Sequence, residues 1–276
     1  MISAHSRGAL PALLVFLLIA GCVNLGGVRD FSETSARTAD YTRLVDVYVE
    51  HPGLQKRFAP ELADILDPEQ AKRETQRAGL LALHQAIEEY MLALANLSAD
   101  EAVDYQTDFE ALGKALGDAG VEDAQRQAVV TVGALVARAA SDGYRRKKIR
   151  EVIREANEPL QVTIQTLRDI VDQIAAEAQD LDTSVGRFYE SRLREARERG
   201  NSGVETILSG WEYRERDEIE KIARAAVDYS GALEKISAAH EELFLHLDEI
   251  NSDELQREMR FYAKEIRTAV KTLREL

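Results

Sequence analysis

The chain has little of the three residues that most often cross-link or interrupt a fold. It contains one cysteine, five prolines and 16 glycines in 276 residues. One cysteine cannot form a disulfide within its own chain, so the fold must depend on packing alone. The scarcity of proline and glycine, with abundant Ala, Leu, Glu and Arg, favours long helices.

Basic residues are also in deficit. The sequence has 35 Lys and Arg against 49 Asp and Glu, which gives a formal net charge of −14. A protein that binds nucleic acid needs a basic surface for the phosphates, so this charge balance argues against such a partner.

Catalytic and metal-binding motifs are missing as well. Helical di-iron sites use Glu-x-x-His, but none of the five histidines has Glu three residues before it. The sequence contains no Gly-x-Ser-x-Gly turn and no glycine-rich phosphate loop between a strand and a helix. The sequence therefore predicts no enzyme, no metal site and no cofactor.

One apolar run stands at the N-terminus and ends at the only cysteine. Arg7 precedes an apolar stretch from Ala9 to Ala20, which is too short for a bilayer span of about 20 residues. The run closes with Ile19-Ala20-Gly21-Cys22. This layout resembles the signal sequence and lipobox of bacterial lipoproteins.

The resemblance implies cleavage before Cys22, a diacylglyceryl group on the Cys22 sulfur, and acylation of its amine, for instance by palmitate. In that class an Asp after the cysteine tends to retain the protein at the inner membrane. Val23 stands there, so the expected location is the outer membrane, facing the periplasm. We accordingly expect a signal peptide over 1–21, a lipid-anchored flexible tether over 22–36, where Gly26-Gly27 favours flexibility, and a helical domain over 37–276.

Apolar residues in the rest of the chain recur in steps of three and four. Over 37–66 the pattern predicts irregular structure or short helices broken at Pro52-Gly53, and over 67–276 it predicts long helices beginning at Asp67-Pro68. Further breaks are expected near Ser98 and at Asn157-Glu158-Pro159, where the sequence leaves a hairpin and a kink both open.

Two segments carry the strictest pattern, with steps alternating between four and three. In the first segment the residues at these steps are Leu160, Ile164, Leu167, Val171, Ile174, Ala178, Leu181, Val185 and Phe188. In the second they are Ile219, Ile222, Ala226, Tyr229, Leu233, Ile236, His240, Leu243, Leu247 and Ile250. These are heptad seams. The predicted fold is all-α: an elongated antiparallel bundle of four or more long helices.

Two groups of residues are candidates for a contact surface. Arg145-Arg146-Lys147-Lys148 is a basic cluster in an acidic protein, suited to anionic lipid or an acidic partner, or else an ordinary solvated helix face. Trp211 and Tyr213 follow a predicted loop at 200–203. They mark either an interface at the end of the bundle or a cap on its core.

Histidine gives the remaining candidate. His240 lies in a heptad seam, where a hydrogen-bonded core residue is the simplest expectation, and His84 lies beside a seam position. A small ligand or metal held between helices near His240 is the alternative.

We expect a membrane-anchored periplasmic scaffold or adaptor that acts through contact with an envelope protein. The alternatives are a helical binding module for a small ligand or metal, and a helical protein that perturbs membranes. The sequence does not fix the oligomeric state.

Overall fold

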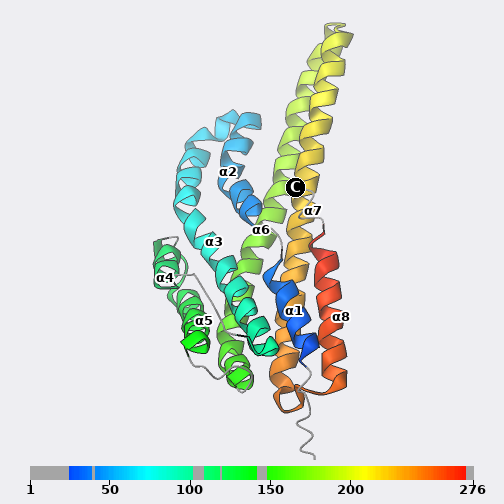
Figure 1. The fold of residues 1–276 in the computed structure, drawn as a ribbon. Coiled ribbons are helices and arrows are strands. Elements are labelled where there is room, and N and C mark those ends of the chain that lie inside the picture. Colours follow the sequence, from blue (N-terminus) through cyan, green and yellow to red (C-terminus); the bar gives the residue numbers. More distant parts are fainter. Residues whose placement is uncertain (1–24, 39–40, 102–108, 119, 142–147, 272–276) are drawn as a thin grey trace, which may run out of the picture.

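A computed structural model describes residues 25–38, 41–101, 109–118, 120–141 and 148–271. These residues form helices joined by short connections and include no strand, so the predicted all-α class is confirmed (Figure 1). The helices are α1 (Gly26–Ala36), α2 (Thr42–Phe58), α3 (Ala63–Ala99), α4 (Phe109–Asp118), α5 (Asp123–Ser141), α6 (Ile149–Glu198), α7 (Ser202–Leu245) and α8 (Asp253–Ala269), with 3-10 turns at Pro60–Leu62 and Leu247–Glu249.

Helix α1 corrects the expectation of a flexible tether that reaches residue 36. Val28 and Phe31 of α1 are fully buried. The Gln256 side chain of α8 accepts hydrogen bonds from the backbone N–H groups of Gly27 (2.7 Å) and Val28 (3.3 Å). A Cβ on Gly27 would lie 2.1 Å from the Gln256 carbonyl oxygen, so only glycine permits this approach. The glycines predicted to loosen the segment instead dock it.

A proline within α2 accounts for a further correction. The expected break at Pro52 is absent, because α2 continues through it to Phe58. Proline at position 52 cannot donate to the carbonyl of Tyr48 four residues earlier. Nη1 of Arg73, on α3, donates to that carbonyl at 2.9 Å. A side chain from a neighbouring helix thus replaces the hydrogen bond that proline removes.

Helix starts and stops also differ from the sequence pattern. Helix α3 begins at Ala63, four residues before the expected start, and contains Pro68. Its end at Ala99 agrees with the break expected near Ser98, and Asp100 follows with φ of 61° in the left-handed region. At Asn157-Glu158-Pro159 there is no hairpin, since α6 is continuous from Ile149 to Glu198.

Helices α6 and α7 form a long antiparallel hairpin. Hydrogen bonds and ion pairs join Gln161 to Ser237, Arg168 to Glu234, and Asp182 to Arg216, so the residue numbers run in opposite directions. Leu160, Ile164, Leu167, Val171, Ile174, Ala178, Leu181 and Val185 are buried along α6, and Phe188 is half-buried. The turn uses Gly200 with φ of 66°, and Asn201 Oδ1 accepts from the Val204 N–H at 3.2 Å.

The hairpin has two distinct parts. Near the ends of α6 and α7 remote from the turn, the other helices pack around it and share the main core. Toward the turn, the hairpin extends beyond the other helices (Figure 1). We call residues 178–223 the arm. The arm has a small separate core, formed by Ala178, Leu181, Val185, Tyr189 and Ile219, against which Leu54 and Phe58 of α2 also pack.

The first helix lies at the opposite end of the molecule from the hairpin turn. Gly27 contacts Gln256, which comes shortly after the end of α7 at Leu245. Helix α1 packs against α3 and α8, and α8 in turn packs against α7 (Figure 1). The chain therefore enters the fold far from the end of the arm.

Candidate functional site

The arm carries the two aromatic residues that the sequence singled out. Both belong to α7, where 49% of Trp211 and 73% of Tyr213 is exposed. This exposure contradicts the alternative that they cap the core. Val204 and Ile207 are exposed on the same helix. Large apolar side chains in solvent at the end of a projecting element are typical of contact surfaces.

Trp211 borders a groove of about 900 Å³ on one side of the arm, which we call the basic groove. Its aromatic floor joins α2 to α6. Phe58 packs edge-on against Phe188 with ring centroids 5.6 Å apart, and Tyr189 lies edge-on to Phe188 at 5.3 Å. Because Phe58 is the last residue of α2, this contact places the end of α2 against the groove.

Four arginines surround that floor: Arg57, Arg192, Arg199 and Arg214. The Arg57 and Arg192 guanidinium carbons each lie 5.5 Å from a ring centroid, of Phe58 and Phe188 respectively. Such cation–π contacts hold the guanidinium against the ring. Arg192 also lies 3.9 Å from the Glu195 carboxylate.

Carboxylates neutralise part of this charge. Glu215 lies 3.5 Å from Arg57, and Glu195 lies 2.7 Å from Arg199. Arg214 donates to the Gly210 carbonyl at 3.3 Å and, within the described part of the chain, has no carboxylate at ion-pair distance. The groove thus has four arginines against three glutamates in a protein of net charge −14.

The other side of the arm has the opposite character. A second groove of about 800 Å³ is bordered by Tyr213 and by the carboxylates Asp182, Glu212, Asp217 and Glu220. Arg216 is the only cation among its lining residues and is held by both oxygens of Asp182, at 2.8 and 2.7 Å. Trp211 and Tyr213 therefore belong to two differently charged faces.

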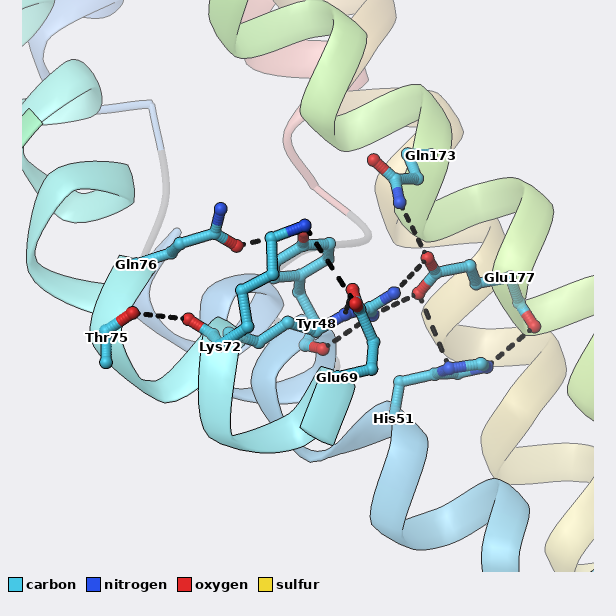
Figure 2. Close-up of polar contacts among 9 residues, drawn as sticks. Tyr48, His51, Glu69, Lys72, Thr75, Gln76, Gln173 and Glu177 are labelled. Carbon is cyan, nitrogen blue, oxygen red and sulfur yellow. Dashed lines mark hydrogen bonds and ion pairs between the residues drawn. The ribbon is translucent and has the colours of Figure 1, made fainter. Parts of the chain in front are cut away.

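A polar cluster fixes α2 and α3 to α6 at the root of the arm (Figure 2). The buried Arg73 guanidinium makes a two-point ion pair with Glu177, at 2.6 and 2.7 Å, and a third contact to Glu69 at 3.0 Å. His51 places Nε2 3.0 Å from the Glu177 carbonyl oxygen, and Gln173 donates to the Glu177 carboxylate at 2.8 Å. This geometry satisfies each charged group within the fold.

Electrostatics in the cluster follow from burial and pairing. Burial alone lowers the pKa of the Arg73 guanidinium, and hydrogen bonds to Glu177 and Glu69 outweigh it, so the net shift is upward. Burial lowers the pKa of His51, although the nearby Glu177 carboxylate opposes this change. Every charged side chain of the cluster is paired with another residue of the fold, so we interpret the cluster as a structural clamp.

His240 is the core histidine that the sequence pattern predicts. It is fully buried, with Nε2 2.7 Å from the Tyr90 hydroxyl and Nδ1 2.9 Å from Asn157 Oδ1. The Asn157 amide donates to Glu241 at 2.8 Å, so its oxygen accepts from Nδ1–H of His240. Tyr90 then donates to Nε2. Both ring nitrogens are occupied, which leaves no position for a ligand.

His84 has a similar environment. Its Nδ1 lies 2.6 Å from the Tyr229 hydroxyl, and Tyr41 stacks on the ring at 5.4 Å. In the described residues no group of three or more His, Cys, Asp or Glu side chains is arranged to hold a metal.

Two other predicted sites have little or no description in the structure. Cys22 and Arg145, Arg146 and Lys147 lie outside the described residues. Lys148 directly precedes α6 and donates to Glu151 at 2.7 Å, which lowers the pKa of that carboxyl. No helix in the described ranges has the length and apolar character required to cross a bilayer.

Sequence reasoning missed most of the basic groove. Arg192 and Arg199 appear in the sequence as cations near a helix C-terminus, which oppose its dipole. Arg57 and Phe58 lie more than a hundred positions earlier. Only the packing of α2 against α6 brings them together.

Comparisons with known proteins add no constraint on the function. No family model, no curated protein and no solved structure matches this chain.

Proposed function

We propose that this protein is a lipid-anchored scaffold or adaptor of the bacterial outer membrane, which recognises an envelope protein with the arm. The observation that carries the proposal is the exposure of Trp211 and Tyr213 on a hairpin that extends beyond the other helices. Trp and Tyr dominate binding energy at many protein interfaces. The absence of a catalytic motif in the sequence agrees with recognition by contact.

The positions of the two ends support this arrangement. Helix α1 begins only a few residues after Cys22 and docks against the first turn of α8, which follows the C-terminal end of α7. Helix α7 has 44 residues, so its start at the arm lies about 66 Å away, at about 1.5 Å per residue. A lipid on Cys22 would place the membrane at one end and the aromatic surface at the other.

We further infer that α6 and α7 form a heptad-packed rod that sets this spacing. The buried apolar positions of both helices follow steps of three and four. Interlocked seams of this kind resist bending better than a single helix. The proposed bundle thus acts as a spacer as well as a platform.

The anchor is tested by acylation. Cells expressing the wild-type chain and supplied with labelled palmitate should yield a labelled protein, and Cys22→Ala should lose that label completely, because no second thiol can be alkylated. The measurement is gel fluorography of the purified protein. An unlabelled wild type, or a label that persists in Cys22→Ala, contradicts the lipid anchor.

The contact role is tested by photo-crosslinking in intact native cells. A photoreactive phenylalanine analogue at Trp211 or Tyr213 should give a discrete adduct with a specific envelope protein, identified by mass spectrometry. The same analogue at Phe261, which is 59% exposed on α8, is the matched control. Adducts that are absent from the arm, or equally strong at Phe261, would reject the proposal.

A further inference from the structure

The basic groove has the form of a helix-binding groove. Its walls come from the antiparallel helices α6 and α7, with lining residues at helical spacing on both. On α6 they include Phe188, Arg192 and Glu195, followed by Arg199 just after its end, and on α7 Val204, Leu208, Trp211 and Glu215. Two adjacent helices with apolar residues between them leave a groove that a third helix fills.

The chemistry of the lining defines what such a helix must carry. The aromatic floor of Phe58, Phe188 and Tyr189, with Trp211 at its border, requires an apolar stripe on the occupant. The arginines at the margin, with Arg214 lacking a carboxylate partner among the described residues, require negative charge beside that stripe. Arginine beside tryptophan is a common combination at the energetic centre of interfaces.

We propose that the basic groove binds an acidic amphipathic helix of the partner protein. This inference rests on the proposed function and specifies its partner. The apolar stripe of the partner helix packs on Phe58, Phe188 and Trp211. Its carboxylates pair with Arg192, Arg199 and Arg214, and Arg57 closes the end of the groove.

Position favours this occupant over the membrane to which the chain is anchored. The end of the arm lies about 66 Å along α7 from the end at which α1 enters the fold. Trp211 itself lies 34 residues, about 51 Å, from the end of α7 at Leu245. In the proposed arrangement, with the arm directed away from the membrane, lipid headgroups of the anchoring leaflet are out of reach. A partner protein held at a distance from the membrane is within reach of the groove.

Trp211 is the only tryptophan in the chain, so its fluorescence reports directly on the groove. The probe is a synthetic helix of about 18 residues, long enough for about five turns. It has leucines at i, i+3, i+4 and i+7 and glutamates elsewhere. One control peptide has lysine in place of every glutamate, and another has the acidic composition in scrambled order.

The acidic helix should shift Trp211 emission to the blue and saturate. The lysine peptide and the scrambled peptide should not shift it. Charge reversal by Arg192→Glu with Arg214→Glu should weaken binding by at least about tenfold, because two attractive pairs become repulsive. Arg260→Glu, at an exposed position on α8, makes the same type of change outside the groove and should leave the affinity unchanged. Circular dichroism of each variant verifies the fold.

Three results overturn this inference. The first is equal binding of the acidic and lysine peptides. The second is a blue shift on phosphatidylglycerol vesicles without one on the acidic peptide, which would indicate a lipid surface. The third is a shift that grows with protein concentration alone, in step with dimer formation, which would place a second copy in the groove.

The outcomes of the two proposals can be separated. If the arm crosslinks to an envelope protein in cells but the acidic helix does not bind, the partner chemistry is wrong and the contact role stands. If neither occurs, both fail.

Discussion

Replacing Arg73 with methionine should lower the free energy of unfolding by about 3 to 5 kcal/mol, the range for removal of one member of a buried ion pair. The Arg73 side chain is only 7% exposed, and Glu177 only 16%. Methionine would leave the Glu177 carboxylate with His51 and Gln173 alone. It would also remove the donor to the Tyr48 carbonyl, which Pro52 cannot replace. Urea unfolding followed by circular dichroism measures the change.

Arg216→Met is the matched control for this experiment. Arg216 also makes a two-point pair across two helices, with Asp182, but its side chain is 48% exposed. Water screens such a pair, so we expect a cost of at most about 1 kcal/mol. In addition, Arg73→Met combined with Glu177→Leu should cost less than the sum of the single changes, since no unpaired charge remains buried. Equal effects of Arg73→Met and Arg216→Met would show that burial of the cluster is unimportant.

Acidification should destabilise the fold through His240 well before most carboxylates protonate. Burial lowers the pKa of His240 to about 3, from 6.5 for an exposed histidine. Between these values the unfolded chain binds a proton that the folded chain excludes. The contribution of neutral His240 to the free energy of unfolding is therefore fully present above about pH 6.5. It falls by about 1.4 kcal/mol per pH unit as the pH drops toward 3. The Tyr90 hydroxyl, which donates to Nε2, would lose its acceptor on protonation.

Urea unfolding at several pH values between about 5 and 7 tests this dependence. The wild-type slope includes His51, whose pKa is also lowered, so the informative quantity is the difference from His240→Gln. In that variant the slope of the unfolding free energy against pH should be smaller by about 1.4 kcal/mol per pH unit, whatever its absolute stability. His246→Gln makes the same substitution at a half-exposed histidine and is the control for the change itself. An unchanged slope in His240→Gln would mean that the core accepts a charged imidazole.

The helical class follows from local pattern, and local pattern is where sequence reasoning succeeded. Steps of three and four placed Leu160 to Val185 on one face of α6, and those residues are buried. The same pattern put His240 in the core with hydrogen-bond partners. Each inference needed only the geometry of one helix.

Failures arose where a distant residue decided the outcome. Gly26-Gly27 suggested a tether, because nothing near them in sequence reveals that Gln256 approaches Gly27. Pro52 suggested a break, because the donor that repairs it belongs to Arg73 on another helix. The candidate site divides in the same way. Exposed Trp211 and Tyr213 could be anticipated near a loop, whereas the arginine margin required α2 to meet α6.

Continuity of α7 has a mechanical consequence. A single unbroken helix runs from Ser202 at the hairpin turn to Leu245 beside α8. No flexible joint along it can absorb a load, so a force on the arm becomes a torque on the opposite end. Over about 66 Å, a tilt of about 10° at that end displaces the far end by about 11 Å. The molecule would behave as a stiff lever, converting small rotations at one end into displacements about as wide as a helix at the other.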